Sequence, residues 1–368
     1  MRSRSVSHSI ARTTTFGVAV TLTLGCAHGS PPQQPTSVLA SAPIMSYAGV
    51  VVASLASTGA VVETRTVSLA LDRIDQRLLP LDNTYRRAGT GRNVTVYVFD
   101  GGVMADHPEL AGRVRVGFSG FPNDTKVCNA HGTAVAGAIA GTTLGVAPEA
   151  EIVDVKMVEC ARLRGTIQAI VDGAKWVVED VKKHPGRRAI ANWSFIADTA
   201  AQIPALDSAV AMLRAHGVPV VVSAGNLETN ACRVSPGNAR GAIVVGSSSV
   251  MRDASRPGAL IDRRSPGTAY GACIDVYAPG DSVLLPSFDR GGNPAAQLWN
   301  GTSMSAGYVS GAIALYLEAA PRAGVDEVGE WLKLTATKNV VEQTRAPVSY
   351  MLYVGAREGG REVQVSQR

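Results

Sequence analysis

The stretch Val94-Thr-Val-Tyr-Val-Phe-Asp100-Gly-Gly102 is a run of β-branched and aromatic residues that ends in a carboxylate and two glycines. An unbroken apolar run of this kind is typical of a strand buried on both faces. Further Val- and Ile-rich runs follow at 152–158, 189–192, 218–222 and 243–245, and helix-like stretches lie between several of them, at 131–140, 166–181 and 206–216. This alternation predicts an α/β fold, with a mainly parallel central sheet covered by helices on both faces.

The composition is that of a folded globular protein. The chain has 368 residues, 46% of them hydrophobic and 18% charged, which is too apolar for a disordered chain. Its 35 basic and 30 acidic residues leave a net charge of +5 without any basic run. We therefore expect no nucleic-acid partner and interpret the charge as a solubility feature.

The N-terminal segment has the order of a secretory signal. Arg2 and Arg4 come first, an apolar stretch follows at 16–25, and Cys26 comes next. The apolar stretch is shorter than the roughly 20 residues that a membrane-spanning helix needs. We therefore expect 1–26 to be a signal peptide and the chain to leave the cytoplasm, where disulfides can persist.

Two interpretations of Cys26 stay open. Leu24-Gly25-Cys26 resembles the bacterial lipoprotein box, in which the cysteine receives lipid after cleavage, although Thr23 stands where the box usually has Leu. Either lipid at Cys26 anchors the protein to a membrane, or an ordinary signal peptide contains this cysteine. The expected location is accordingly secreted or the cell envelope: the periplasmic face, an outer-membrane lipoprotein or the extracellular space.

Three later segments each place a reactive side chain at a strand end or a helix start. Asp100 ends the first strand, His131 lies in Asn129-Ala-His131-Gly-Thr, and Ser303 lies in Asn300-Gly-Thr-Ser303-Met. Each alone is as well explained by a turn or a helix cap. Together, in the chain order Asp, His, Ser, they match the subtilisin arrangement of the Ser-His-Asp triad.

The chemistry of such a triad accounts for these residue types. A Ser hydroxyl is a weak nucleophile, so His131 would take the proton of Ser303 as it attacks, while Asp100 holds the imidazole in the required tautomer. An oxyanion also needs a hydrogen-bond donor. Asn226, at the end of Val220-Val-Val-Ser-Ala-Gly-Asn226, supplies a suitable side-chain amide.

With these motifs the sequence resembles the subtilisin-like serine proteases (peptidase S8 family), specifically the secreted proteinase K and aqualysin branch. The resemblance implies a three-layer αβα subtilisin-like fold and a serine endopeptidase that acts on proteins or peptides through an acyl-enzyme, with no cofactor required for chemistry. It covers about residues 69–352, including Leu71-Asp-Arg-Ile-Asp-Gln-Arg77, Pro80-Leu-Asp-Asn-Thr-Tyr85, His131-Gly-Thr133, Ser223-Ala-Gly-Asn226, Tyr277-Ala-Pro-Gly280 and Asn300-Gly-Thr-Ser-Met304.

The resemblance also sets the expected domain organisation. Residues 27–68 are expected to be a linker with a short or degenerate prosegment, because they are too few for the usual folded inhibitor domain. The peptidase domain is expected at 69–355, and a polar C-terminal tail at 356–368. We expect a monomer.

The disulfides and the substrate contacts are implied by the same resemblance. The branch pairs Cys128 with Cys160 and Cys232 with Cys273, whereas the count alone allows three pairings of four cysteines. An extended peptide is expected to add as a strand beside 191–195. The residues expected to contact it are Ser194, Phe195, Ile196, Ser223, Ala224 and Gly225.

Several positions depart from the family pattern. Ile196 puts a branched side chain where the family leaves backbone open, so we expect a narrowed or reshaped pocket for the substrate residue before the scissile bond. Ser249 stands where this branch often has a calcium-binding Asp, so structural calcium stays open and the metal ligands are unknown. The flanks of the triad also differ, at Gly101, Ala130, Ala134, Gly307 and Tyr308.

Those altered flanks define the alternative function, a catalytically impaired protein that keeps the fold and binds peptides or partners. The active protease is favoured because all four chemical residues are present. A lipase or esterase of the α/β-hydrolase class is disfavoured, since its nucleophile elbow needs Gly-x-Ser-x-Gly and the chain order Ser, acid, His.

Overall fold

A computed structural model describes residues 22–23, 61–197 and 202–355. Eleven strands among these residues form the central sheet, in the order β17-β19-β14-β12-β11-β9-β4-β6-β5, with β13 paired to β12 and β18 paired to β13. Their bounds are β4 (Val94–Asp100), β5 (Val114–Ser119), β6 (Glu151–Lys156), β9 (Arg188–Trp193), β11 (Val220–Ser223), β12 (Ile243–Arg252), β13 (Leu260–Arg264), β14 (Val276–Pro279), β17 (Thr337–Lys338), β18 (Val341–Glu342) and β19 (Tyr350–Met351).

The strand that decides the fold, β4, is buried along its whole length and sends alternate side chains to two cores. Val96 and Val98 belong to one hydrophobic cluster, and Tyr97 and Phe99 belong to the other. Because successive side chains of a strand point to opposite faces, a continuous apolar run requires cover on both faces of the sheet.

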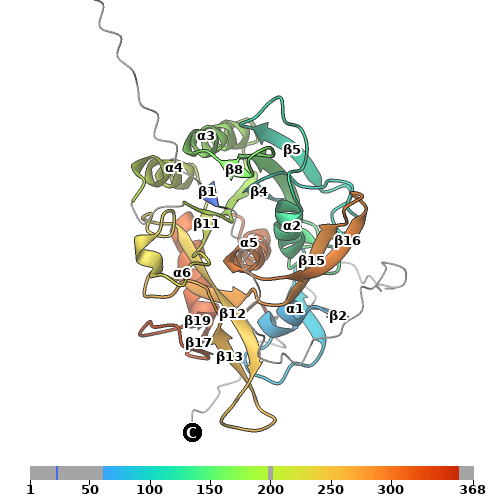
Figure 1. Cartoon of the computed structure of the whole chain (residues 1–368), viewed down its shortest axis with the longest axis vertical. Coiled ribbons are helices and arrows are strands. Elements are labelled where there is room, and N and C mark those ends of the chain that lie inside the picture. Colours follow the sequence, from blue (N-terminus) through green and yellow to red (C-terminus); the bar gives the residue numbers. More distant parts are fainter. Residues whose placement is uncertain (1–21, 24–60, 198–201, 356–368) are drawn as a thin grey trace, which may run out of the picture.

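Helices provide that cover and make three layers (Figure 1). The cluster that contains Tyr97 and Phe99 also includes side chains of α3 and α4, whereas α1, α2, α5 and α6 contribute to the other cluster. The helices are α1 (Leu69–Ile74), α2 (His131–Ala140), α3 (Ile167–Lys183), α4 (Pro204–Ala215), α5 (Thr302–Ala319) and α6 (Val325–Thr335), with a short 3₁₀ turn at Ala231–Arg233.

β4 is also where the order of the strands reverses. β6 and β5 lie on one side of β4, and β9, β11, β12 and β14 follow one another on its other side. In open α/β sheets, ligands bind at the carboxyl ends of the strands next to such a reversal. Asp100 is the last residue of β4, so the fold places it at that crevice.

The expected strand at 152–158 was wrong at its C-terminal end. β6 stops at Lys156, and Val158–Glu159 forms β7 in a separate antiparallel sheet. The Lys156 ammonium donates to the carbonyls of Asp124 and Lys126, and the disulfide between Cys128 and Cys160 holds the chain that follows. These contacts bring the chain out of the central sheet.

That separate sheet has the order β10-β1-β8-β7, formed by β10 (Ile196–Ala197), β1 (Leu22–Thr23), β8 (Arg164–Gly165) and β7. A hairpin and a second antiparallel pair, whose strands flank α1 in the sequence, complete the fold. β15 (Val283–Phe288) pairs with β16 (Pro294–Trp299) and lies against α2 in Figure 1. β2 (Val61–Arg65), which precedes the expected start of the domain, pairs with β3 (Thr84–Ala88).

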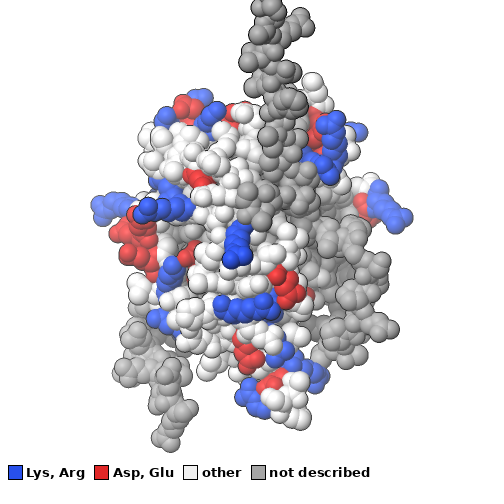
Figure 2. All heavy atoms as spheres, turned by 60° about the vertical axis from the view of Figure 1, so that its left-hand side comes forward, with Lys and Arg blue, Asp and Glu red and all other residues white. Residues whose placement is uncertain are grey.

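The surface mixes both signs of charge. On the face drawn in Figure 2, Lys and Arg side chains are interspersed with Asp and Glu over a largely uncharged surface. Within the described ranges, none of the helices combines the length and the apolar character that crossing a bilayer requires.

A buried ion pair ties α1 to the far edge of the sheet. Arg73 of α1 donates from Nε and Nη2 to the two carboxylate oxygens of Asp262 on β13, at 2.8 and 2.7 Å. The two side chains are 0% and 4% exposed. Arg73 also donates to the carbonyls of Gln76 and Arg77, so its guanidinium is satisfied away from water.

Asp262→Ala should therefore destabilise the protein strongly, because it leaves the Arg73 charge buried without its partner. Loss of one member of a buried pair typically costs about 3–5 kcal/mol. Urea unfolding measures this loss, and Glu179→Ala, which removes an exposed pair with Lys182, is the matched control and should change little. Equal effects of the two substitutions would contradict the prediction.

Candidate active site

Asp100 and His131 meet at the carboxyl end of β4. His131 Nδ1 lies 2.7 Å from Asp100 Oδ2, and both side chains are buried. The other carboxylate oxygen of Asp100 accepts a hydrogen bond from the Gly101 N–H at 2.7 Å. Asn129 Oδ1 accepts from the His131 N–H and so satisfies a donor at the start of α2. The imidazole is thus held by a carboxylate that is itself fixed.

Close packing of α5 on α2 sets the position of Ser303. A β-carbon added to Gly307 would lie 3.0 Å from the Val135 carbonyl oxygen, and one added to Gly311 would lie 2.9 Å from that of Ile139. From the first contact to the second, the residue number rises by four in each helix, so the two helices run parallel and in register. One helical turn earlier in both helices, the same pairing brings Ser303 beside His131.

Ser303 lies in the first turn of α5, where main-chain N–H groups and the helix dipole favour negative charge. Its hydroxyl donates to the carbonyl of Ser194 at 3.2 Å, and the Ser194 hydroxyl donates to the Ser303 carbonyl at 3.0 Å. The Ser194 hydroxyl in turn accepts from the amide of Asn192 at 2.8 Å. This network fixes the segment after β9 against the start of α5.

Asn226 follows β11 and contacts the same helix start. Its Oδ1 accepts from the main-chain N–H and the hydroxyl of Thr302, at 3.0 and 3.1 Å. Because Oδ1 accepts both bonds, the amide Nδ2 is the donor end of the side chain. A β-carbon on Gly301, which has φ +137, would lie 3.0 Å from that Nδ2. A side chain at position 301 would displace the Asn226 amide, so this position requires glycine.

The expected substrate contacts divide into two groups. Phe195 and Ala224 are buried in the core, where Phe195 stacks on Trp193 at 5.5 Å. Ser223 donates to the Phe195 carbonyl and links the two segments beside Ser303. Ile196 and Gly225 face each other across the space between those segments, with Ile196 Cγ2 3.1 Å from where a Gly225 β-carbon would lie.

The edge that a peptide could join is shorter than the one expected. β9 has β4 on one side and β11 on the other, so both edges of 191–193 are occupied, whereas the pairing of neither neighbour reaches residues 194–195. β10 instead pairs with β1 of the chain itself, which also pairs with β8. The short strand directly after β9 is therefore the open one.

The structure contains both disulfides that the resemblance implied, Cys128–Cys160 and Cys232–Cys273. The first lies directly beside the triad Asp, since a β-carbon on Gly101 would lie 3.2 Å from that of Cys128. A side chain at position 101 would thus be in tight contact with the disulfide, while the Gly101 N–H donates to Asp100. Cys26 lies outside the described residues.

Comparison with known proteins agrees with this geometry. The profile of the Subtilase family matches residues 91–350. The chain belongs to the subtilase family. This confirms the resemblance at the level of the family and of the three-layer fold. A crystal structure of a cold adapted subtilisin-like serine proteinase matches with a TM-score of 0.69 and 35% identity, covering 80% of this chain and 100% of that one.

Two curated relatives are also similar to this subtilase. The "Extracellular serine proteinase" of Thermus sp. (strain Rt41A) is 36% identical over 286 residues, which is 77% of this chain. The "Alkaline serine exoprotease A" of Vibrio alginolyticus is 35% identical over 285 residues. The chain spans 65% and 49% of the length of these two relatives.

One residue at the site was missed by the sequence analysis. Trp299, at the end of β16, lies edge-on to the His131 ring with centroids 6.2 Å apart. It covers the imidazole on the side of the β15–β16 hairpin. Its place directly before Asn300-Gly-Thr-Ser303 was the signal that could have indicated this role.

The hydroxyl of Ser249, at the position where the family often has a calcium-binding Asp, donates to Asp281 Oδ2 at 2.7 Å. Among the described residues, the His, Cys, Asp and Glu side chains spaced for a metal are those of Asp124, Cys128 and Cys160, and the two sulfurs are joined in a disulfide.

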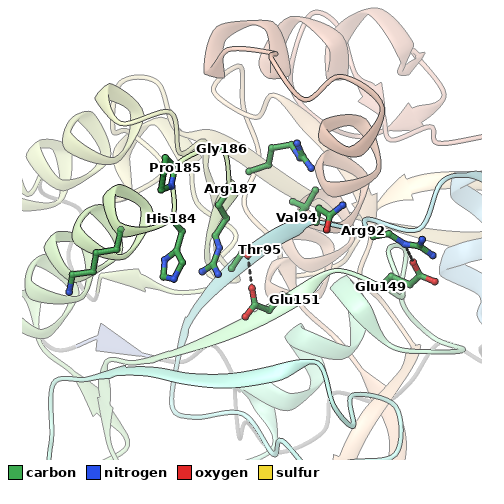
Figure 3. Close-up of a pocket in the computed structure, with 12 residues that line it drawn as sticks. Arg92, Val94, Thr95, Glu149, Glu151, His184, Pro185, Gly186 and Arg187 are labelled. Carbon is green, nitrogen blue, oxygen red and sulfur yellow. Dashed lines mark hydrogen bonds and ion pairs between the residues drawn. The ribbon is translucent and has the colours of Figure 1, made fainter.

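A separate hollow of about 820 Å³ lies at the opposite edge of the sheet, at the amino ends of β4, β6 and β9. Figure 3 shows two interactions among its lining residues, from Arg92 to Glu149 and from the Thr95 hydroxyl to Glu151, each at 2.7 Å. None of the triad residues lines it. It is therefore distinct from the candidate active site of this subtilase.

Asp154 of β6 is a second buried carboxylate near Asp100. Its Oδ2 accepts from the Val103 N–H at 3.2 Å, while its Oδ1 has no hydrogen-bond partner among the described residues. Burial raises its pKa from 3.8 to about 7, and the neighbouring Asp100 adds to the rise. In the sequence, Asp154 is recognisable as an acidic residue between the apolar residues of a predicted strand.

Asp154→Asn should increase the stability of this subtilase more at pH 8 than at pH 5. The folded protein keeps a proton on Asp154 up to about pH 7, whereas the unfolded chain releases it near pH 4, so wild type loses stability as pH rises between these values. The loss is on the order of a few kcal/mol. Thermal unfolding in a Ser303→Ala background measures it, and a difference in Tm that does not change with pH would contradict the prediction.

Proposed function

We propose that this subtilase is a serine endopeptidase that hydrolyses peptide bonds of proteins through an acyl-enzyme. The observation that carries the proposal is the bond of 2.7 Å between His131 and Asp100, combined with the register of α2 and α5 that brings Ser303 beside the imidazole. The names of the two curated relatives support a proteinase.

The proposed reaction begins when a substrate carbonyl carbon is attacked by Ser303 Oγ. His131 Nε2 takes the hydroxyl proton, and Asp100 stabilises the imidazolium that forms. The hydroxyl leaves the Ser194 carbonyl and turns toward His131 for this step. The oxyanion accepts from Asn226 Nδ2 and from the N–H groups at the start of α5. His131 then gives its proton to the leaving amine, and water hydrolyses the acyl-enzyme by the same route.

The small antiparallel sheet supports binding of an extended chain next to this centre. Leu22 of β1 pairs with Gly165 and Ala197, and Thr23 pairs with Arg164 and Ile196. A two-residue strand is thus held by main-chain hydrogen bonds on both sides. Binding by strand addition accepts many sequences, because the main chain supplies the affinity.

We also propose that the mature protein acts outside the cytoplasm as a monomer, either secreted or attached to the envelope by lipid at Cys26. The signal-like order at 1–26 and the two disulfides support this location. The chemistry described needs no cofactor. Palmitate labelling of wild type and Cys26→Ala in the bacterial host tests the lipid anchor.

Ser303→Ala should lower proteolysis of a protein substrate by about 10⁴-fold or more and leave the fold intact, because only the nucleophile is lost. A fluorophosphonate probe should label the wild type at Ser303 and should not label His131→Ala, which lacks the general base. An unlabelled but folded wild type would instead support the catalytically impaired alternative.

Asn226→Ala should lower kcat by about 10²–10³-fold with a small change in KM, the loss associated with one oxyanion donor in subtilisin. The amide also caps α5 through Thr302, so thermal unfolding must be measured in parallel. Asn226→Asp is the matched control, since it keeps the accepting oxygen and removes the donor. Wild-type kcat in this control would overturn the role of the amide.

A further inference from the structure

The register of a bound strand along β10 indicates which substrate residue has its carbonyl attacked. In the antiparallel register of β1, Leu22 lies opposite Ala197 and Thr23 lies opposite Ile196. A bound strand in this register advances toward Phe195 and then Ser194, one position for each residue. Ser194 is the residue whose carbonyl accepts the Ser303 hydroxyl. The substrate residue opposite Ser194 is therefore the one whose carbonyl is attacked.

Three directions at that substrate residue follow from the proposed reaction and from this register. Its carbonyl carbon lies at Ser303 Oγ, its carbonyl oxygen at the Asn226 amide, and its N–H at the Ser194 carbonyl. Its side chain is then directed into the space between two segments, residues 194–196 and residues 223–226. These segments are linked by the bond from the Ser223 hydroxyl to the Phe195 carbonyl.

Ile196 fills this space. With Thr23 of β1 paired opposite it, the residue is 4% exposed. Its Cγ2 and Cδ1 lie 3.1 and 3.2 Å from the position of a β-carbon on Gly225, which itself has φ +102. The branched side chain thus reaches from one wall to the other, and the glycine opposite gives it room.

We propose that Ile196 closes the pocket for the side chain before the scissile bond, so that this enzyme cleaves after Gly or Ala and rejects large residues. This inference rests on the proposed endopeptidase function. A methyl group needs little depth, whereas an aromatic or long side chain would have to displace Ile196 from the contact with Gly225.

The test uses fluorogenic peptides Leu-Thr-Leu-X, which begin with the Leu-Thr of β1 and continue with the next residue of the sequence, with X as Gly, Ala, Val, Phe or Lys. Wild type should prefer Ala over Phe by about 100-fold in kcat/KM. Ile196→Gly should raise kcat/KM for Phe by a similar factor and change that for Ala little. Ile196→Val is the matched control and should keep the preference of the wild type.

Ile196→Ala gives an intermediate pocket if the glycine variant does not fold. Equal cleavage after Ala and Phe by wild type, or an unchanged ratio in Ile196→Ala and Ile196→Gly, would overturn the inference. The fluorophosphonate probe separates the two proposals. If Ser303 is not labelled, the endopeptidase function and this inference fail together. If Ser303 is labelled but no peptide is cleaved, inactivation by peptidyl phosphonates carrying Ala or Phe measures the same preference.

Discussion

Because Gly307 and Gly311 lack side chains, α5 lies directly on carbonyl oxygens of α2, and this contact sets the start of α5, with Ser303, relative to the start of α2, with His131. Gly137 allows a second close contact, on another side of α2. A β-carbon at this position would lie 2.3 Å from Pro286 of the β15–β16 hairpin. That hairpin carries Trp299 to His131. Any side chain at these glycines would separate elements whose spacing fixes the active centre to within an ångström.

The candidate catalytic residues and the strands proposed to bind the peptide lie in different parts of the fold. Asp100, His131 and Ser303 are on the central sheet and its helices, where packing determines their positions. In the proposed function, recognition of the peptide falls to β8 and β10, which lie outside that sheet and both pair with β1. A change at Ile196 can therefore alter which peptide is cleaved while the reacting atoms stay where they are.

Much of this arrangement could be predicted from local patterns. The alternation of Val96 and Val98 with Tyr97 and Phe99 identifies a strand buried on both faces, and each triad residue lies in a short motif. The sequence marks the positions of Trp299 and Asp154 but not their contacts, because these depend on which distant segments fold against them. The expected peptide edge began too early, since the pairing on both sides of 191–193 is visible only in the sheet order.

The ion pair between Arg73 and Asp262 has a consequence for the order of assembly. Its two members are 189 positions apart in the sequence. A guanidinium buried without its carboxylate is strongly unfavourable, so α1 can dock in its native position only after synthesis has passed β13. Ser303 is synthesised later still. The ribosome has therefore made most of the chain before any catalytic centre exists.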